Sequence, residues 1–412
     1  MNIPSVRLSA GPQARTHPRF AALPPLALYV HLPWCIRKCP YCDFNSHEVR
    51  ESVPQSQYTD ALVADLDSAL PLVWGRRVYS VFFGGGTPSL FDADRIATIL
   101  SAIRARLPLA ADAEITLEAN PGTAEAAKFA GYRGAGVNRL SIGVQSFDAK
   151  RLQALGRIHD DEQAHRAIEI ASEHFDNFNI DLMYALPGQT PAQAASDVDV
   201  AITYRAPHVS AYHLTIEPNT YFHRYPPAIP DEDTAALIHE EVARRLAGSG
   251  YDHYETSAHA QPGRRSRHNL NYWLFGDYLG IGAGAHSKLT FADRVLRQAR
   301  YRQPREYMAR ALSGSAVQTD TPVAAAELPF EFMMNALRLN GGFRTTLFEE
   351  RTGLPLTTVL PLLDEAERRG LIWRDHERVV PTELGQRFLN DLLQVFLPQR
   401  SASSAGACDT PR

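Results

Sequence analysis

Three of the four cysteines crowd into one short segment of the sequence, at Cys35, Cys39 and Cys42. They follow a C-x-x-x-C-x-x-C spacing directly after an apolar run, whereas Cys408 stands alone in a Ser/Ala-rich stretch. A cubane iron–sulfur cluster normally takes four thiolates. Three thiolates from one loop would leave one iron open to an exogenous ligand, which can then receive an electron from the metal. The spacing therefore predicts an oxygen-sensitive 4Fe–4S cluster.

A structural zinc site is the alternative for these cysteines. Zinc takes four closed ligands, typically as two separated pairs. The second pair is missing here, although His31 or His47 could complete a set. Zinc sites also rarely begin at the end of the first strand of a barrel. We therefore favour the cluster, and a fourth ligand from Cys408 would require the C-terminal end to fold back.

Six apolar, β-rich runs surround the cysteine segment along the chain, and helical patterns separate them. The runs are Leu26–Leu32, Val78–Phe83, Glu114–Ala119, Asn138–Gly143, Phe178–Tyr184 and Val209–Ile216. The helical patterns include Gln57–Leu70, Asp92–Leu107, Asp160–Phe175 and Pro191–Tyr204. Strands that alternate with helices indicate right-handed βαβ units in a parallel sheet. Six units are too few for an eight-unit barrel, so the predicted fold class is α/β, a partial (β/α)6 barrel that binds ligands at the carboxyl ends of its strands.

The pattern changes in the last third of the chain. From Glu327 to Leu397 it shows amphipathic helices and a hairpin candidate, Leu371–Val380, which indicates a smaller, mainly helical, winged-helix-like domain. We favour packing of this domain against the barrel over DNA binding, because no basic face is evident. The predicted segments are a flexible leader (1–25), the partial barrel (26–230), a barrel extension (231–320), the C-terminal helical domain (321–398) and a disordered tail (399–412).

Composition and charge exclude several classes of partner. The formal net charge of -4 gives no electrostatic case for binding a nucleic-acid backbone. No apolar run reaches the ~18 residues that a membrane helix needs. The N-terminal segment has no apolar core of a secretory signal, and four cysteines are too few for a disulfide framework. We therefore expect a cytoplasmic protein with no direct membrane span.

A glycine run, VFFGGGTPSL at residues 81–90, follows the second predicted strand. Glycines let a backbone approach a ligand closely. Together with the cysteine segment, this run resembles the radical SAM superfamily, in which the open iron chelates the amino and carboxylate groups of S-adenosylmethionine (SAM) and reductive cleavage gives a deoxyadenosyl radical. The resemblance implies that the glycine run contacts the methionine amino group. On this basis Gly85→Val is expected to weaken SAM binding and to leave the cluster content largely intact.

Over about residues 26–390 the sequence is similar to the branch of that superfamily containing the oxygen-independent coproporphyrinogen III dehydrogenase. The cofactor contacts that this resemblance implies are Tyr29, Tyr41, Gly85, Gly86, Thr87, Glu118 in LEANPG, Gln145 in SIGVQSF, Arg157 in LGRIH and Asp181 in NIDLMYALPGQT. From the residues alone, these polar groups interrupt or follow apolar strands where a barrel places its ligand, and a bound cofactor would supply their partners. A helix cap or a hydrogen bond inside the barrel is the alternative for Gln145 and Asp181.

Two features separate the sequence from the dehydrogenases. The dehydrogenases carry a further cysteine where this chain has Phe44, and they have a longer N-terminal segment over the active site. Instead, RSRHNLNYWLFGDYLGIGAGAHS at residues 265–287 resembles the H-N-x-x-Y motif of the HemW-type haem chaperones. That resemblance makes His268 the first candidate for a haem-iron ligand and Tyr272 the second.

Other residues of this motif suit a porphyrin. Three arginines could pair with propionates through their guanidinium forks, and three aromatic side chains could cover a porphyrin face. They are Arg264, Arg265 and Arg267, and Trp273, Phe275 and Tyr278. Alternatively, His268 and Asn269 could simply hydrogen-bond a loop, and His213 and His286 are weaker ligand candidates.

The favoured hypothesis is a haem chaperone that carries a 4Fe–4S cluster, SAM and haem. It would pass haem to haemoproteins, among them membrane-associated respiratory enzymes, and the resemblance implies a homodimer. The alternatives are oxidative decarboxylation of coproporphyrinogen III and radical SAM chemistry on another porphyrinoid. Enzymatic activity is left open, and no catalytic residue is predicted.

Overall fold

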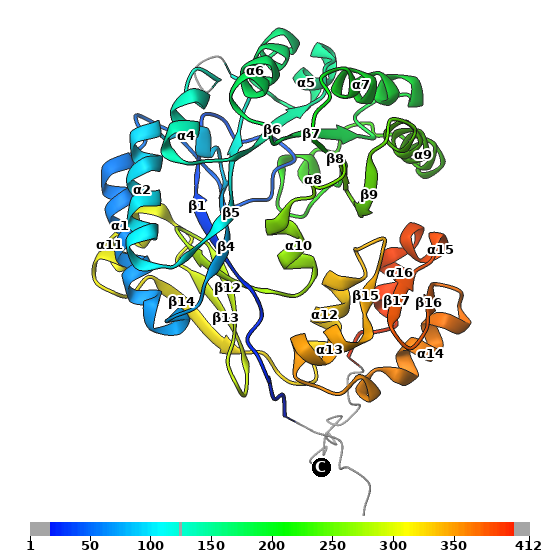
Figure 1. Cartoon of the computed structure of the whole chain (residues 1–412). Coiled ribbons are helices and arrows are strands. Elements are labelled where there is room, and N and C mark those ends of the chain that lie inside the picture. Colours follow the sequence, from blue (N-terminus) through cyan, green and yellow to red (C-terminus); the bar gives the residue numbers. More distant parts are fainter. Residues whose placement is uncertain (1–16, 123–125, 399–412) are drawn as a thin grey trace, which may run out of the picture.

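The computed structural model describes residues 17–122 and 126–398, and its centre is one sheet of 12 strands in the described part of the chain (Figure 1). Adjacent parallel pairings join seven of these strands into a curved wall. In spatial order they are β11 (Asp277–Ile281), β1 (Leu26–Leu32), β4 (Val78–Gly85), β5 (Leu109–Ala119), β6 (Arg139–Gln145), β7 (Phe178–Tyr184) and β8 (His208–His213). The prediction of an α/β, partial barrel is confirmed.

All six predicted strands form, and two of them, β1 and β7, have the predicted bounds. The seventh parallel strand, β11, was not anticipated. It is short and contains Asp277, so its sequence lacks the continuous apolar run of the others. Because β11 pairs with β1, the chain between residues 277 and 281 returns to the first strand of the wall.

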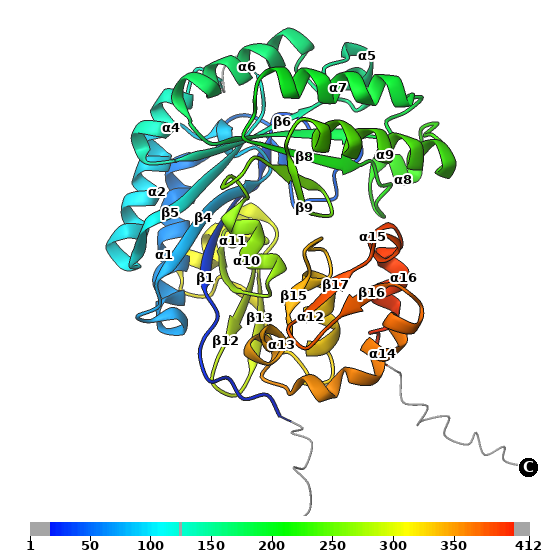
Figure 2. The same ribbon diagram turned by 45° about the vertical axis from the view of Figure 1, so that its right-hand side comes forward.

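Helices cover the outer face of the wall (Figure 2). They are α1 (Gln55–Val73), α2 (Ala93–Arg106), α4 (Phe129–Ala135), α5 (Ala149–Ala154), α6 (Asp161–His174), α7 (Pro191–Thr203) and α9 (Glu232–Gly248). Local sequence sets where some of them begin. Asp160 with Gln163, and Thr190 with Gln193, form reciprocal capping boxes at the starts of α6 and α7.

One short helix, α10 (Arg267–Trp273), lies on the inner side of the wall, across β4 from α1 and α2 (Figures 1 and 2). It contacts β4, β1 and β11. Helix α10 carries the H-N-x-x-Y motif, so the fold places that motif inside the partial barrel. We call the inner side of the wall, on which α10 lies, the lumen.

Antiparallel strands extend both edges of the wall. The strands β10 (Ala258–Ala260) and β9 (Asp252–Glu255) continue from β8, and β12 (His286–Thr290), β13 (Val295–Arg300) and β14 (Val317–Pro322) continue from β11. Helix α11 (Pro304–Leu312) packs against α1. The buried Arg300 guanidinium lies 3.3 Å from the Asp65 carboxylate, which also accepts a hydrogen bond from Tyr307 at 2.9 Å. A buried ion pair therefore ties this extension to α1.

The C-terminal residues form a second hydrophobic core. Its elements are α12 (Leu328–Ala336), β15 (Phe343–Arg344), α13 (Thr345–Thr352), α14 (Leu360–Arg368), β16 (Ile372–Arg374), β17 (Arg378–Pro381), α15 (Glu383–Arg387) and α16 (Leu389–Gln394). The expected hairpin corresponds to β16 and β17, and β15 completes a three-stranded sheet. This unit packs on the barrel through contacts of α12 with α10 and through a bridge between Glu255 and Leu339.

The segment boundaries predicted from the sequence remain predictions. Residues 1–16 of the predicted leader, and the predicted tail with Cys408, lie outside the described residues. Within the described ranges, no helix has both the length and the apolar character required to cross a membrane.

Candidate functional site

The cysteine segment lies at the carboxyl end of β1, where it forms the short strands β2 (Trp34–Cys35) and β3 (His47–Glu48). The three thiols are half-buried and close enough together to influence one another's charge. Burial raises the pKa of the Cys35 and Cys42 thiols, against hydrogen bonds that lower it. The three cysteines thus lie side by side at the carboxyl end of β1, the end of the barrel at which ligand binding was predicted.

The arrangement of donors disfavours a single zinc ion. His31 uses both ring nitrogens elsewhere, Nδ1 with the Tyr29 hydroxyl at 3.0 Å and Nε2 with the Asn45 carbonyl at 2.9 Å. Across the described residues, no three His, Cys, Asp or Glu side chains are gathered tightly enough for one metal ion. Zinc holds sulfurs at about 2.3 Å from one point, whereas a cubane separates its thiolates by its own width. Three thiols without a fourth closing ligand fit the cubane better.

The glycine run begins within β4, extends beyond its carboxyl end and packs directly on the cysteine segment. Gly85 has φ +119°, and a Cβ there would lie 2.5 Å from the His31 ring. A Cβ on Gly86 would lie 2.5 Å from the Trp34 carbonyl oxygen. The backbone amides of Gly86 and Thr87 donate to the Leu32 and Trp34 carbonyls at 2.8 and 2.7 Å. These glycines therefore let the turn approach the chain's own cysteine segment.

Two carboxyl groups face each other in the lumen below the glycine run. Burial raises the pKa of Glu118 to about 8, and the nearby Asp181 adds to that rise. Burial also raises the pKa of Asp181, against hydrogen bonds from Ser141 and Asn179 at 2.9 and 2.7 Å. Arg139 lowers the pKa of Asp181 only in part, and a ligand with hydroxyl or amino donors would further satisfy the two carboxyl groups.

Arg157 lies over the cysteine segment from the side of β6. Its guanidinium donates to the Cys39 thiol at 3.5 Å, to the Asn120 side chain at 2.7 Å and to the Gly143 carbonyl at 2.8 Å. Its remaining donor, Nε, is buried without a hydrogen-bond partner among the described residues. An orphaned guanidinium N–H beside the thiols fits the carboxylate of a bound amino acid.

Most of the predicted cofactor contacts lie beside the cysteine segment, near the carboxyl ends of β4–β6, whereas Tyr29 and Asp181 lie at the middle of β1 and β7. Tyr41 lies against Cys39 and Arg157, and burial raises its pKa. Gln145 ends β6 with φ 68°, a left-handed conformation that is uncommon outside glycine. The members of this group are Tyr29, Tyr41, Gly85, Gly86, Thr87, Glu118, Gln145, Arg157 and Asp181. Sequence reasoning missed Asn120, which follows Glu118 in the same LEANPG motif.

His268 lies deep in the lumen, away from the cysteines. Its Nδ1 lies 3.0 Å from the Ser80 hydroxyl, and its ring stacks on Phe82 at 4.8 Å. Burial lowers the pKa of His268 to about 3, so the imidazole is neutral at pH 7. Ser80 and Gly85 are five residues apart on β4, which is about 17 Å along the strand. The two predicted sites are therefore brought to one lumen and held at its two ends.

The helix carrying His268 is fixed at its start by Glu114. The two carboxylate oxygens of Glu114 accept hydrogen bonds from the backbone amides of Arg267 and His268, both at 3.0 Å. Ser266 adds a side-chain cap to Asn269 at 3.3 Å. A carboxylate at a helix start satisfies the free amides and complements the helix dipole. This double cap holds α10 in place.

The other candidates of the haem motif have different surroundings. Arg265 and Arg267 form exposed ion pairs with Asp252 and Asp112. Tyr272 stacks on Tyr278 at 4.1 Å. Three further positions lie apart from His268: Phe275 packs on Phe332 in the C-terminal core, and His213 and His286 lie on β8 and β12. The Tyr272 ring also lies 6.5 Å from the His268 ring, so the structure keeps Tyr272 beside His268 and separates the other three from it.

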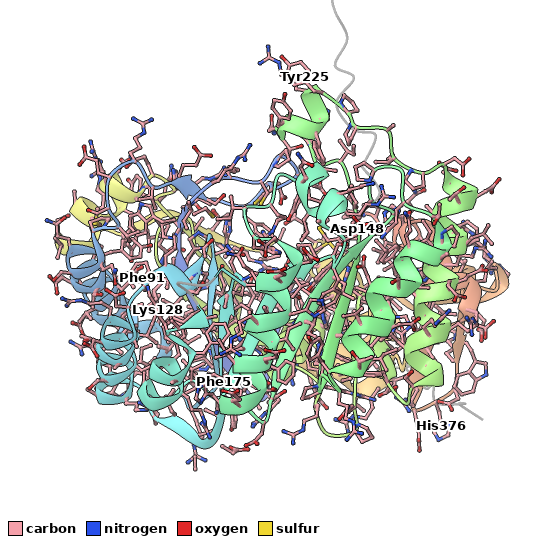
Figure 3. The ribbon with its side chains drawn as sticks, turned by 90° about the horizontal axis from the view of Figure 1, so that it is seen from above. Phe91, Lys128, Asp148, Phe175, Tyr225 and His376 are labelled. Atoms are coloured by element: carbon pink, nitrogen blue, oxygen red, sulfur yellow. The ribbon has the colours of Figure 1, made fainter. Side chains whose placement is uncertain are left out.

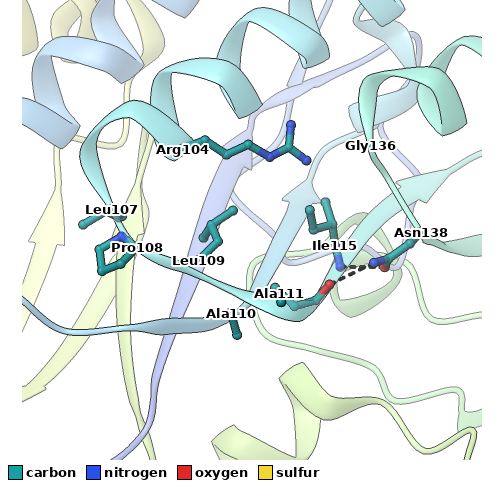
Figure 4. A pocket seen from close by; sticks show the side chains of 10 residues that line it. Arg104, Leu107, Pro108, Leu109, Ala110, Ala111, Ile115, Gly136 and Asn138 are labelled. Atoms are coloured by element: carbon teal, nitrogen blue, oxygen red, sulfur yellow. Dashed lines mark hydrogen bonds between the residues drawn. The ribbon is translucent and has the colours of Figure 1, made fainter.

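The mouth of the barrel is partly covered by the segment after β8, which includes α8 (Tyr221–Arg224). The Phe222 amide donates to the Pro40 carbonyl at 3.0 Å, and the Phe222 ring lies 6.4 Å from that of Tyr41. Tyr225 projects outward from this segment (Figure 3). A cavity of about 450 Å³ at the opposite end of the sheet, lined by Arg104 and Asn138 among others, contains none of the predicted site residues (Figure 4).

Comparisons with known proteins agree with this geometry. The radical SAM superfamily matches residues 29–201, and the HemN C-terminal domain matches residues 323–388. The chain is 49% identical to the heme chaperone HemW of Escherichia coli over 379 residues, which is 92% of this chain and 99% of that protein. It is 44% identical to the heme chaperone HemW of Haemophilus influenzae, with 92% and 99% coverage. The solved structure of coproporphyrinogen III oxidase HemN from Escherichia coli has the same fold, with TM-score 0.77, 24% identity and coverage of 91% and 90%.

Proposed function

The chain belongs to the radical SAM superfamily and to the family of the heme chaperone HemW, and on that premise we propose that it binds haem and transfers it to haemoproteins. Membrane-associated respiratory enzymes are the proposed acceptors, and a cytoplasmic homodimer is the proposed form. The protein would also hold a 4Fe–4S cluster and SAM at the carboxyl ends of the strands. The haem site and the cluster site would then share one lumen.

Cys35, Cys39 and Cys42 would hold the cluster, which supplies an electron to the sulfonium of SAM when both are bound. Binding of iron requires thiolates, so the cysteines must lose their protons on loading. The N–H of Arg157 and the hydroxyl of Thr87 each point at one of these sulfurs at 3.5 Å. Hydrogen bonds of this kind favour the charged form of sulfur.

The residues around the cysteines fit the groups of SAM. The unpartnered Nε of Arg157 suits the carboxylate of the methionine part. The buried Glu118 and Asp181 suit hydroxyl or amino donors, and Tyr29, Tyr41 and Gln145 line the same end of the lumen. Gly85 and Gly86 support this site through the cysteine segment that they contact.

His268 is the proposed ligand of the haem iron. Its Nδ1 contacts Ser80, while no hydrogen bond reaches its Nε2 from the described residues. Protein ligands to metals commonly have this arrangement, in which one ring nitrogen is oriented by a partner and the other binds the metal. The low pKa keeps the ring in the neutral form that binds iron.

Tyr272 is the less suitable ligand. Burial raises its pKa well above the ordinary value, which disfavours the phenolate that binds iron. In the present conformation His268 is only 5% exposed. A haem iron can reach Nε2 only if α10 shifts away from β4, so haem binding would require the hydrogen bonds from the Arg267 and His268 amides to Glu114 to break.

A haem titration of the anaerobically reconstituted protein tests the proposal. We expect a saturable, near-stoichiometric Soret band that shifts or disappears in His268→Ala. His165→Ala is a matched control, because His165 lies on α6 at the outer face and contacts Phe147 and Tyr204. Weak binding that is unchanged in His268→Ala would overturn the haem proposal.

The same preparation distinguishes the alternative activity. Coproporphyrinogen III dehydrogenase would decarboxylate propionates, and mass analysis of the product would show the loss. The position of the dehydrogenases' further cysteine is occupied by Phe44, whose side chain is exposed on the cysteine segment. We therefore expect no decarboxylated product under conditions in which the Soret band forms.

A further inference from the structure

We propose that Asn120 is a positioning residue that orients the two hydrogen-bond donors aimed at the sulfurs of Cys35 and Cys39, and thereby raises the reduction potential of the cluster. This inference rests on the cluster of the proposed function and is independent of haem binding. No predicted cofactor contact includes Asn120, which lies just beyond the carboxyl end of β5.

The geometry is a continuous bridge between two cysteines. The Thr87 hydroxyl donates to Cys35 Sγ at 3.5 Å, and an Arg157 N–H donates to Cys39 Sγ at 3.5 Å. Asn120 joins the two donors: its Oδ1 accepts from Arg157 at 2.7 Å and its Nδ2 donates to Thr87 Oγ1 at 3.1 Å. One side chain thus contacts both residues that reach the sulfurs.

The direction of each hydrogen bond follows from the chemistry of the groups. A guanidinium can only donate, so the Asn120 atom next to Arg157 must be the carbonyl oxygen. The Asn120 amide nitrogen then necessarily faces Thr87 and donates to its oxygen. Because that oxygen already accepts a hydrogen bond from Asn120, the hydroxyl hydrogen of Thr87 is directed at Cys35. The amide group of one asparagine thus supplies both the acceptor for Arg157 and the donor to Thr87.

Asn120 is itself held in place. Its backbone amide donates to the hydroxyl of Ser89, a fully buried residue of the glycine run, at 3.2 Å. Arg157 is anchored independently by the Gly143 carbonyl at 2.8 Å. The bridge is therefore preorganised between β5, β6 and the glycine run before any ligand enters.

The consequence concerns the charge of the cluster. Reduction adds negative charge to the thiolate-bound iron and sulfur, and hydrogen bonds to the sulfurs stabilise that charge. Removing Asn120 leaves the Thr87 hydroxyl free to rotate away from Cys35 and loosens the Arg157 fork. Loss of one charge-assisted hydrogen bond to a sulfur is expected to change the reduction equilibrium about tenfold. For one electron, a tenfold change is about 59 mV toward more negative potential.

The experiment is a redox titration of the cluster in the full-length, anaerobically reconstituted protein, followed by electron paramagnetic resonance. We expect Thr87→Val and Asn120→Leu each to lower the midpoint potential, with iron and sulfide content near that of the wild type. In the double variant we expect the potential of Asn120→Leu alone, because Thr87 acts only through the orientation that Asn120 imposes. Thr87→Ser keeps the hydroxyl and should retain the wild-type potential.

Asn120→Asp provides a second route if Asn120→Leu does not fold. It keeps the acceptor for Arg157 but removes the donor to Thr87, whose proton then turns to the carboxylate. The potential should fall, and Thr87→Val should have little further effect in that background. Asn138→Asp is the matched control, because Asn138 contacts Ile115 and Ala113 at the middle of β5, away from the cysteines, and should leave the potential unchanged.

The outcomes separate the inference from the proposed function. An unchanged potential in Asn120→Leu and Asn120→Asp, or shifts of Thr87→Val and Asn120→Leu that simply add, would overturn the role of Asn120 while the cluster stands. A loss of iron without a change in the potential of the remaining clusters would assign Asn120 a purely structural role and overturn the inference as well. Failure of the wild type to bind a cluster would overturn the cluster part of the proposed function.

Discussion

Glu118 Oε2 accepts a hydrogen bond from the backbone amide of Gly85 at 3.1 Å. The contact joins the end of β5 to the glycine run, which itself packs on the cysteine segment. Burial raises the pKa of Glu118 to about 8, so the carboxyl is mostly protonated at pH 7. The side chain that supports the glycine run is thus poised to change its charge near physiological pH.

The raised pKa of Glu118 predicts a pH dependence of stability. Between pH 4.5, the ordinary pKa of a glutamate, and pH of about 8, Glu118 keeps its proton in the folded state but loses it in the unfolded state. The stabilisation that this proton gives to the folded state is therefore complete below pH 4.5 and is lost as the pH rises through about 8. Glu118→Gln cannot ionise and should gain melting temperature relative to the wild type between pH 5 and pH 8.5, by roughly 2–4 °C for each kcal/mol.

Thermal unfolding of the cluster-free protein at several pH values measures this difference. Glu173→Gln on the exposed face of α6 is the control and should follow the wild type at every pH. A difference between Glu118→Gln and the wild type that does not vary with pH would contradict the assignment.

Replacing Cys35, Cys39 and Cys42 together by alanine should abolish the iron–sulfur absorbance near ~410 nm after anaerobic reconstitution, because those bands need thiolate ligands. Cys408→Ala should retain both the absorbance and the iron content. Absorbance and iron that persist in the triple variant would refute the cluster assignment, and loss of both in Cys408→Ala would identify a fourth thiolate ligand.

Gly85→Val should reduce cluster content as well as SAM affinity, which differs from the expectation based on the sequence alone. The new side chain would meet the His31 ring, and the backbone at φ +119° is strained for any residue with a Cβ. Because His31 also holds Asn45 in the cysteine segment, the displacement would reach the thiols.

Iron content and SAM binding of this variant can be measured on the same sample. Gly75→Ala is a suitable control, since Gly75 also has a positive φ but a Cβ there has nothing within 4 Å. Normal iron content in Gly85→Val, with weakened SAM binding, would instead support the interpretation from the sequence, in which the glycine run contacts SAM and does not affect the cluster.

Glu114→Gln should speed the association of haem. The substitution removes the charge that caps α10 at the amides of Arg267 and His268, and so favours the displacement that exposes His268. A loss of about 1 kcal/mol from the cap corresponds to about a fivefold faster opening. Stopped-flow measurement of the Soret change gives the rate directly.

Asp112→Asn is the matched control for this rate. Asp112 forms only an exposed ion pair with the side chain of Arg267, and exposed pairs contribute little. An unchanged or slower rate in Glu114→Gln would mean that haem does not enter by displacement of α10.

The sequence predicted six strands of the partial barrel but not the seventh, β11, which pairs with the first. Six strands were found because their apolar runs are buried on both faces and stand out from the helical patterns. Strand β11 was not, because the buried Asp277 interrupts its apolar pattern and pairs with Lys288 on β12 and with Arg76 from a distant part of the chain. Charge pairing over 201 residues leaves no local signal.

The same limit applies to the candidate site. Motif spacing located the cysteines, and resemblance supplied the polar residues now seen around them. Asn120 was missed because its neighbours in space, Thr87 and Arg157, lie 33 and 37 residues away. The sequence pointed to His268 but not to its burial, which depends on the Glu114 cap and the stacking on Phe82.

The cysteine segment is closed from far along the chain. Asn45 donates to the carbonyls of Ala283 and Arg302, both at 2.9 Å. These partners are translated after a delay: 257 residues separate Asn45 from Arg302, which takes roughly 10–50 s at ordinary rates of synthesis. Until then the three thiols of the nascent chain lie in a segment that lacks the hydrogen bonds from Asn45 to Ala283 and Arg302. The hydrogen bonds that close the cysteine segment therefore form late in synthesis, well after the three thiols themselves have been translated.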